Sequence, residues 1–295
     1  MVILEGNDKF FFYRYFYNIS ILVLLIFLLT ACSSTRFIYT FIETFIQDEV
    51  NYFLDLDEEE EKLLNQQVSE MVAWHRISML PSYSLYLNNI AYKLEENKYK
   101  ATDINKVLNN GRLLIEETVT GLTPYVSKFL IQYQTIEAIE FIEKKMIMRR
   151  QEQLEKLSES EGKAYKDRLK RLILNFGRFL GDLNDAQVML LEKHARVTLN
   201  DPKTRLQNRT LRQKVFIEFL KTQPTEVELT TYLNKLLLRG HMITNPDYEA
   251  FSQNSVERFR LLVLNMLEIS SITQRERIIS KLRDYADDFK SIAKN

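Results

Sequence analysis

The segment Trp74-His75-Arg76 has the residue types best suited to chemistry, and it holds the only tryptophan of the chain. A histidine titrates near neutral pH, so it can accept or donate a proton. An arginine binds a carboxylate or a phosphate through two parallel hydrogen bonds. Tyr83 follows shortly after, beyond Pro81. We therefore expect Trp74, His75, Arg76 and Tyr83 to be candidates for ligand binding.

A structural role for the same histidine is the alternative. At helical spacing Val68, Met71, His75 and Met79 share one face, so the imidazole points into or along the core. A proline interrupts a helix, because it lacks the backbone N–H and its ring clashes with the preceding turn. His75 could then bond a backbone carbonyl where Pro81 breaks the helix. The sequence leaves both interpretations open.

Metal binding and nucleophilic catalysis have little support in the pattern. His75, His194 and His241 are far apart, and none has a second histidine three or four residues away, the spacing typical of zinc ligands on a helix. The chain has one cysteine, no Gly-x-Ser-x-Gly turn and no glycine-rich phosphate loop. We therefore expect no metal, no cofactor and no catalytic residues, and so a protein that is not an enzyme.

The one cysteine, Cys32, stands at the end of an apolar run. Ile19 to Ala31 is almost wholly aliphatic and follows Lys9 and Arg14, which is the layout of a secretory signal. Leu29-Thr30-Ala31-Cys32 resembles the bacterial lipobox, a leucine and two small residues before an obligatory cysteine. The resemblance implies a signal peptide over residues 1–31, cleaved before Cys32. It also implies a diacylglycerol anchor on the thiol and a further acyl chain, such as palmitate, on the new amino terminus.

Acyl chains on Cys32 would hold the polypeptide to a membrane, because each buried methylene contributes about 0.8 kcal/mol. In lipoproteins of this kind an Asp after the cysteine tends to retain the protein at the inner membrane, and Ser33 stands there instead. We expect the outer membrane, on its periplasmic side, with the inner membrane as the alternative. An uncleaved helix over residues 10–31 could also span a bilayer if Arg14 extends to the interface.

The rest of the chain, residues 32–295, has the composition of a helical protein. It is neutral overall, which gives no reason to expect nucleic acid as a partner. In the whole chain glycine occurs seven times and proline five times, and strand-like alternation is absent. We expect an all-α fold, a multi-helix bundle behind the signal peptide, in one periplasmic domain with possible lobes at 32–158 and 159–295.

Helix starts can be located from capping boxes, in which a polar N-cap and a Glu or Gln three residues later satisfy two free backbone N–H groups. Five pairs have this spacing: Asp57 and Glu60, Ser158 and Glu161, Asn184 and Gln187, Thr225 and Glu228, and Ser271 and Gln274. With the apolar periodicity they predict helices over 36–54, 57–79, 82–96, 102–121, 124–157, 160–181, 184–199, 203–221, 225–239, 246–269 and 272–293.

Charge is uneven along the neutral chain. From Asp48 to Glu61 every charged residue is acidic, whereas Lys144 to Lys214 is rich in bases, including Lys170, Arg171, Arg209 and Arg212. The acidic run lies where a helix begins, and carboxylates there interact favourably with exposed N–H groups. The basic region could contact phospholipid or another envelope polyanion. The alternative is a solvated helix face.

Several segments together resemble a family of bacterial lipoproteins catalogued as domain of unknown function 6279. They are the lipobox, Tyr52-Phe53-Leu54-Asp55-Leu56-Asp57, Trp74-His75-Arg76, Leu80-Pro81-Ser82-Tyr83, Ile272-Thr273-Gln274-Arg275 and Leu282-Arg283-Asp284-Tyr285-Ala286-Asp287-Asp288. The resemblance covers essentially the whole mature chain, with Glu60 standing where the family often has Gln. It implies no established catalytic activity, so it assigns no active-site residues.

These observations favour a non-enzymatic, lipid-anchored helical protein that binds an envelope partner, in assembly or stress protection. One alternative is an envelope hydrolase or small-ligand enzyme that uses His75 and Arg76. Another is a structural spacer. A cavity that holds His75, Arg76 and an acid would favour the enzyme.

Overall fold

The computed structural model describes residues 34–96 and 101–294, which are helical with no strand among them. The expected all-α multi-helix fold is therefore confirmed. The chain divides into two units, Met1–Phe41 and Ile42–Asn295. In the first unit the described part is one short helix, α2 (Ser34–Thr40). The predicted signal peptide and lipobox, with Leu29, Thr30, Ala31 and Cys32, lie outside the described residues.

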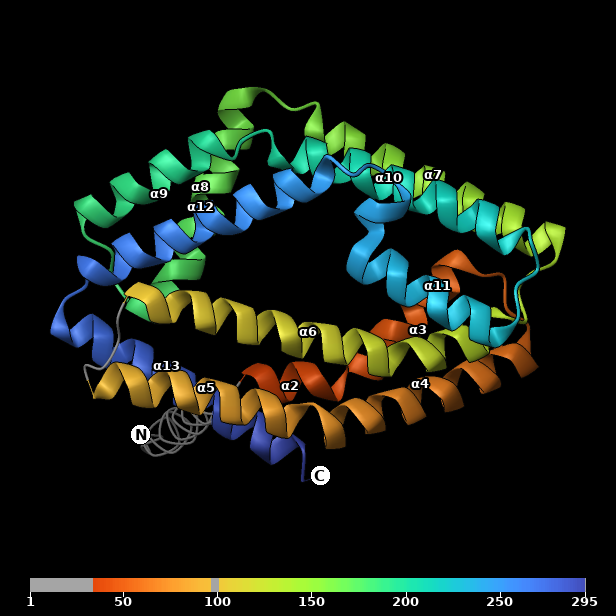
Figure 1. Cartoon of the computed structure of the whole chain (residues 1–295), viewed down its shortest axis with the longest axis horizontal. Coiled ribbons are helices and arrows are strands. Elements are labelled where there is room, and N and C mark those ends of the chain that lie inside the picture. The colour runs from red at the N-terminus through yellow and green to blue at the C-terminus, as the bar shows by residue number, and fades with distance from the viewer. Residues whose placement is uncertain (1–33, 97–100, 295) are drawn as a thin grey trace, which may run out of the picture. The chain divides into compact units, whose positions relative to one another are not determined.

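The second unit contains the remaining helices (Figure 1). In chain order they are α3 (Ile42–Phe53), α4 (Glu58–Ser78), α5 (Leu80–Glu95), α6 (Ala101–Leu130), α7 (Ile136–Leu157), α8 (Glu161–Leu180), α9 (Asp185–Val197), α10 (Asp201–Leu220), α11 (Glu226–Arg239), the 3-10 turn η1 (Gly240–Ile243), α12 (Tyr248–Glu268) and α13 (Ile272–Ile292).

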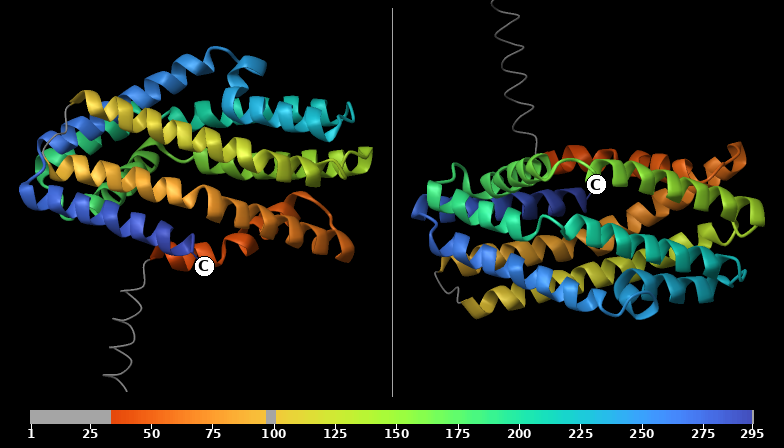
Figure 2. Two further views of the ribbon diagram at one scale, coloured as in Figure 1. Left: turned by 60° about the horizontal axis from the view of Figure 1, so that its bottom comes forward. Right: turned by 90° about the horizontal axis from the view of Figure 1, so that it is seen from above.

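These helices form two groups. In the view of Figure 1, α7, α9, α10 and α12 run above, and α4, α5, α6 and α13 run below. Within the lower group α13 lies along α5, as both views of Figure 2 also show. The groups meet where α8 packs on α13 and α9, and where α11 packs on α6. Contacts such as α5 with α13 join residues on either side of residue 158, and the division into lobes there stays a prediction.

Four of the five predicted capping boxes are confirmed, those that begin at Asp57, Asn184, Thr225 and Ser271. The fifth was misplaced. Ser158 caps the end of α7, where its hydroxyl donates to the Glu155 carbonyl over 2.7 Å. Ser160 is the N-cap of α8 and accepts from the Lys163 N–H. The two serines therefore cap the two helices that this short connection joins, Ser158 at the end of α7 and Ser160 at the start of α8.

Two of the boxes are joined through their glutamines. Gln187 Nε2 donates to Gln274 Oε1 over 2.9 Å, and Gln274 Nε2 donates back to Gln187 Oε1 over 3.0 Å. Each acceptor oxygen also receives the N-cap backbone N–H of its own helix. Gln187 is fully buried, so this pairing fixes the start of α9 against the start of α13 without leaving a buried amide unsatisfied.

The predicted break between helices 102–121 and 124–157 is wrong, because α6 runs through Gly121 and Pro124 to Leu130. The interruption falls later, and Thr135 caps the start of α7. Gly121 stands under the indole of Trp74, since a β-carbon built there would lie 1.9 Å from Trp74 Cη2. The glycine is therefore required for close packing of α4 on α6, and it does not end the helix. Pro124 lies on the exposed side.

Where the upper helices meet, the core is a cluster of buried side chains from α8, α9 and α12. Leu180, Leu191, Leu262 and Met266 are its fully enclosed members, and partly buried side chains such as Leu172 and Phe176 cover it. Burial of apolar surface at about 25 cal/mol per Å² is the main stabilisation available to such a cluster. It holds α8, α9 and α12 in fixed relation, and these three helices carry most of the polar site described next.

Candidate functional site

The predicted candidates at the end of α4 and the start of α5 fall into two environments. Trp74 packs on Gly121 of α6, and its ring centroid lies 6.5 Å from that of Tyr125. This is a packing role at the contact between α4 and α6. Arg76 is half-buried on the same helix.

His75 and Tyr83 are brought together by the tight connection between α4 and α5. The His75 ring meets the edge of the Tyr83 ring at a centroid distance of 5.7 Å, and Tyr83 in turn meets Phe289 at 5.8 Å. The Tyr83 hydroxyl hydrogen-bonds the Thr118 hydroxyl, which donates to the Leu114 carbonyl. Burial lowers the pKa of His75 below its usual value. The imidazole is therefore biased toward its neutral form in an aromatic setting.

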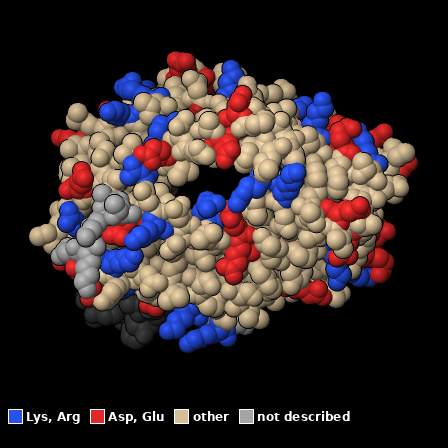
Figure 3. All heavy atoms as spheres, in the orientation of Figure 1, with Lys and Arg blue, Asp and Glu red and all other residues tan. Residues whose placement is uncertain are grey.

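A cavity of about 840 Å³ lies between the two groups of helices. In Figure 3 this face of the molecule is hollowed at its centre, between α12 and α6, and both basic and acidic side chains reach the rim. Its walls come from α5, α6, α8, α9, α10, α12 and α13. Tyr83 and Phe289 line it, whereas Trp74, His75 and Arg76 do not. Its size is within the range of cavities that hold small ligands.

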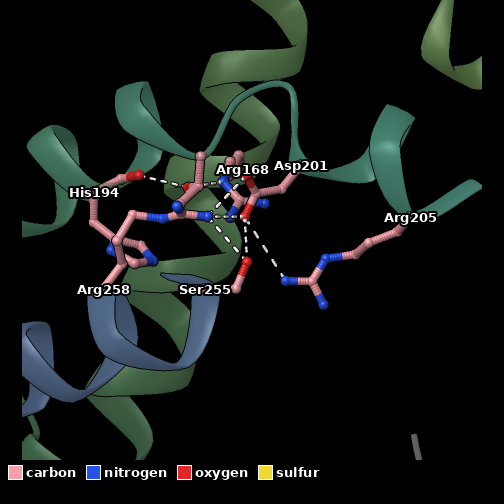
Figure 4. A network of polar contacts seen from close by, with 7 residues as sticks. Arg168, His194, Asp201, Arg205, Ser255 and Arg258 are labelled. Carbon is pink, nitrogen blue, oxygen red and sulfur yellow. Dashed lines mark hydrogen bonds and ion pairs between the residues drawn. The ribbon is translucent and has the colours of Figure 1, made fainter. Parts of the chain in front are cut away.

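A polar network forms one wall of this cavity, and Figure 4 shows it from close by. Asp201, at the first turn of α10, is buried, and both of its oxygens accept from Arg258 Nη2 of α12, at 3.1 and 2.9 Å. The same nitrogen donates to Ser255 Oγ over 3.0 Å. Arg205, one turn along α10, approaches Asp201 at 3.7 Å.

Arg168 of α8 joins the network through the end of α9. Its Nε donates to Thr198 Oγ1 over 2.7 Å, and Thr198 donates to the His194 carbonyl over 2.5 Å. This chain fixes Arg168 and His194 beside Asp201, as Figure 4 shows. Buried polar groups joined in this way specify one arrangement of the helices that carry them.

The charges in the network do not balance. Arg168, Arg205 and Arg258 bring three positive charges, and Asp201 brings one negative charge, so a formal excess of two positive charges remains. Burial lowers the pKa of Arg168, and the neighbouring Arg171, Arg205 and Arg258 lower it further, while Asp201 opposes the change.

The same surroundings also lower the pKa of His194. Burial is the largest cause that lowers the pKa of His194, followed by Arg168 and Arg258, with Asp201 again opposing. Burial first, and the positive neighbours second, therefore favour the neutral form of this imidazole. A neutral imidazole and uncompensated guanidinium groups are suited to an anionic partner.

Apart from Asn109, Arg112 and Ser252, the rest of the cavity lining is mainly apolar and aromatic, and Arg112 is paired with Glu116 at 2.6 Å. The Tyr86 hydroxyl is satisfied by the Val107 carbonyl at 2.9 Å, so its ring presents a mainly apolar surface to the cavity. The apolar lining comprises Tyr83, Tyr86, Leu87, Leu108, Leu114, Ile115, Leu172, Tyr248, Phe251, Val256, Phe259 and Phe289. The arrangement can hold a molecule that is apolar over most of its length and anionic at one end.

In residues 34–96 and 101–294, no three His, Cys, Asp or Glu side chains lie close enough together to hold a metal ion. Over the same residues, no helix is both long and apolar enough to span a bilayer.

The sequence alone did not identify most residues of the polar network. Arg168 and Arg205 fall inside the basic segment 144–214, which was considered for polyanion contact, but Asp201 and Arg258 were not singled out. The available signal was Asn200-Asp201-Pro202, a helix start followed four residues later by Arg205. Another part of that segment pairs with the acidic segment, because Arg149 bonds Glu49 at 2.9 Å and lies 4.2 Å over the Tyr52 ring.

Comparison with protein-family models places these residues in a known group. The model described as a family of unknown function, DUF6279, matches residues 52–249. The chain belongs to this family. The match includes Trp74, His75, Arg76, Tyr83 and Asp201, and it ends before Arg258 and before the segments 272–275 and 282–288, so it is narrower than the resemblance drawn from the sequence. No curated protein and no solved structure matches the chain.

Proposed function

We propose that this member of the family is a non-enzymatic binding protein of the bacterial envelope, tethered by lipid on Cys32 and holding its ligand in the central cavity. The observation that carries the proposal is the cavity of about 840 Å³, apolar along most of its wall and lined at one side by Arg168, Asp201 and Arg205, with Arg258 bonded to Asp201. A large concave site with few convergent polar groups is the usual form of a ligand-binding site.

The tether is supported by the lipobox resemblance at Leu29-Thr30-Ala31-Cys32. Ser33 after the cysteine favours the periplasmic side of the outer membrane over the inner membrane. An anchored protein whose cavity opens to the periplasm would meet ligands released from, or destined for, the membrane beside it. The folded helices themselves would need no apolar span to remain there.

Binding is better supported than catalysis. His75 packs against Tyr83, and neither His75 nor Arg76 lines the cavity. The network offers two groups that could act as a general base, His194 and Asp201, but among the described residues that line the cavity no acid or nucleophile is hydrogen-bonded to the His194 ring to complete a catalytic set. The oxygens of Asp201 are occupied by Arg258 and Ser255. A carboxylate engaged in this way holds helices together and is poorly placed to accept a proton from a substrate.

Tethering is tested by mass spectrometry of the full chain purified from separated inner and outer membranes, with Cys32→Ser as the control. The proposal expects an outer-membrane protein that begins at an acylated Cys32, and a control that is not acylated. A chain intact from Met1 with an unmodified thiol would reject the tether. Recovery in the inner membrane would reject the proposed location.

Ligand binding is tested by solvent extraction of the purified protein followed by mass spectrometry of the extract. Ser252 is exposed on the cavity wall, so Ser252→Trp fills the cavity, while Gln253→Trp places the same ring on the neighbouring residue, which does not line it. The proposal expects a small molecule that accompanies the parent protein and Gln253→Trp but is lost from Ser252→Trp. An extract that is the same for all three would contradict it.

A further inference from the structure

We infer that the ligand of the central cavity is an amphiphile with one anionic head group, a carboxylate or a phosphate monoester, on a hydrocarbon chain. The inference rests on the proposed function, because it names the ligand class for the same cavity. It is carried by two features of the cavity, a cluster of arginines with excess positive charge and a second, apolar cavity that adjoins the first.

The side of the cavity proposed to bind the head group has arginine N–H donors that the network does not use. Hydrogen bonds within the described residues use the Nε of Arg168 and leave its two terminal nitrogens without a partner. Arg205 is 3.7 Å from Asp201, too far for a hydrogen bond, and its side chain is about half exposed at 56%. Two guanidinium groups on the cavity wall therefore have donors available, and guanidinium binds carboxylate and phosphate with matched planar geometry.

The charge fits a single small anion. One carboxylate reduces the formal excess of two positive charges by one, and a phosphate monoester near neutral pH removes most of it. Asp201 is already held by Arg258, so an entering anion would meet Arg168 and Arg205 and not displace the existing pair. His194 lies on the same wall and can gain a proton beside an anion, adding a further donor.

The tail side is defined by the adjoining cavity of about 410 Å³. The two cavities share Leu172 and Phe259 in their linings, so they adjoin at these two side chains, and the inference places the hydrocarbon chain across this boundary. The second cavity is enclosed mainly by aliphatic and aromatic residues of α5, α8, α12 and α13, including Phe176, Phe179 and Val263. Burial of a hydrocarbon chain there gains about 0.8 kcal/mol per methylene.

The two sides together select the class of ligand. A wholly polar anion would leave the apolar walls and the second cavity exposed to water, and a neutral lipid would leave the arginine cluster uncompensated. A molecule with one charged end and one hydrocarbon end satisfies both. Fatty acids and alkyl phosphates share this chemistry, and an experiment can separate them.

The test uses membranes that contain the full chain and four photoreactive dodecyl probes, each with a diazirine in the chain and a terminal alkyne. The head groups are carboxylate, phosphate, hydroxyl and trimethylammonium. The inference expects labelling by the carboxylate or phosphate probe to exceed labelling by the hydroxyl and trimethylammonium probes by about tenfold or more, the scale set by one or two charge-assisted hydrogen bonds. Because the diazirine is in the chain, the labelled peptides should come from α5, α8, α12 and α13, which line the second cavity.

Matched variants locate the head group. Arg205→Gln removes an exposed donor on the cavity wall and should reduce labelling by the anionic probes by about tenfold. Arg209→Gln, one turn along the same helix, removes an arginine that bonds Gln153 and does not line the cavity, so labelling should be unchanged. Circular dichroism of both variants checks that they are folded. Equal effects of the two variants would overturn the inference.

The outcomes separate this inference from the proposed function. If the four probes label the cavity equally and Ser252→Trp abolishes the labelling, the cavity binds ligands but the anionic class is wrong. If no probe labels the cavity, the inference fails, whereas ligand co-purification still decides the proposed function. A phosphate signal well above the carboxylate signal would assign a phosphorylated lipid, and the reverse would assign a fatty acid.

Discussion

Arg258 holds Asp201 by a single nitrogen, since Nη2 lies 3.1 Å from one carboxylate oxygen and 2.9 Å from the other. The contact joins the middle of α12 to the start of α10 across the wall of the cavity. Because Asp201 is the one acid among three arginines there, this pair sets both the position of the two helices and the charge that a ligand meets.

Replacing Asp201→Asn should destabilise the protein, because it leaves three guanidinium groups close together with no negative charge. Breaking a buried ion pair costs about 3–5 kcal/mol. The Arg258 side chain is 30% exposed, so solvent screening should reduce the loss to roughly 2 kcal/mol. Urea unfolding measures it, and dodecyl phosphate should restore part of the loss.

The control for that change is Asp247→Asn, at an exposed N-cap whose side chain makes no cap hydrogen bond. Its stability should stay within about 0.5 kcal/mol of the parent. Equal stability of the Asp201 and Asp247 variants would show that the network contributes nothing to the fold.

Gly121→Ala should destabilise the protein although alanine favours helix. The new β-carbon would lie 1.9 Å from the Trp74 indole, so α4 and α6 must move apart. Overpacking of this kind costs about 1–3 kcal/mol, against a helix-propensity gain of about 1 kcal/mol. Thermal unfolding should show a lower midpoint, and Trp74→Leu in the same chain should relieve the clash.

A matched glycine lies on α8. A β-carbon at Gly177 meets nothing within 4 Å, so Gly177→Ala should gain about 0.5–1 kcal/mol from helix propensity alone. The two substitutions are chemically identical and opposite in expected sign. If both stabilise the protein, the contact of Trp74 with Gly121 is not close.

Gln187→Glu should lower the free energy of unfolding more than Glu60→Gln does. The fully buried Gln187 both donates to and accepts from Gln274, and a carboxylate cannot donate. The loss of that bond and burial of a charge should cost roughly 2 kcal/mol. Glu60→Gln keeps the acceptor for the Asp57 N–H at an exposed cap and should change stability by less than about 0.5 kcal/mol. Chemical denaturation of the two variants compares them directly.

Stability should fall as the pH falls below about 6.5, partly because of two histidines. The pKa values of His75 and His194 are both lowered, mainly by burial. Between the lowered folded value and the ordinary unfolded value, the unfolded chain binds more protons, so acid favours unfolding. In each of the variants His194→Gln and His75→Gln, the urea concentration at the unfolding midpoint should change less with pH over this window. An unchanged pH dependence in both variants would contradict the lowered pKa values.

The helical elements were largely predictable from the sequence because their signals are local. The capping boxes at Asp57, Asn184, Thr225 and Ser271 depend on two side chains three residues apart, and each begins a helix as expected. The error at Gly121 and Pro124 came from reading both as helix breakers. The space above a glycine is decided by another helix, here through Trp74, and one sequence carries no sign of that contact.

The cavity was predictable only in small part, because its walls come from seven helices. Tyr83 was among the candidates and does line it, while Trp74, His75 and Arg76 do not. Arg168, Asp201 and Arg258 are separated by dozens of residues, and each alone resembles an ordinary surface charge. Only the packing of α8, α9, α10 and α12 on one another brings them together beside the cavity.

The most direct test of the account is a crystal structure of the protein with dodecyl phosphate bound. We expect the phosphate within hydrogen-bonding distance of Arg168 and Arg205, and the alkyl chain passing between Leu172 and Phe259 into the second cavity. A ligand seated elsewhere, for example in the apolar cavity between α3, α4, α6 and α7, with no contact to these arginines, would contradict the account.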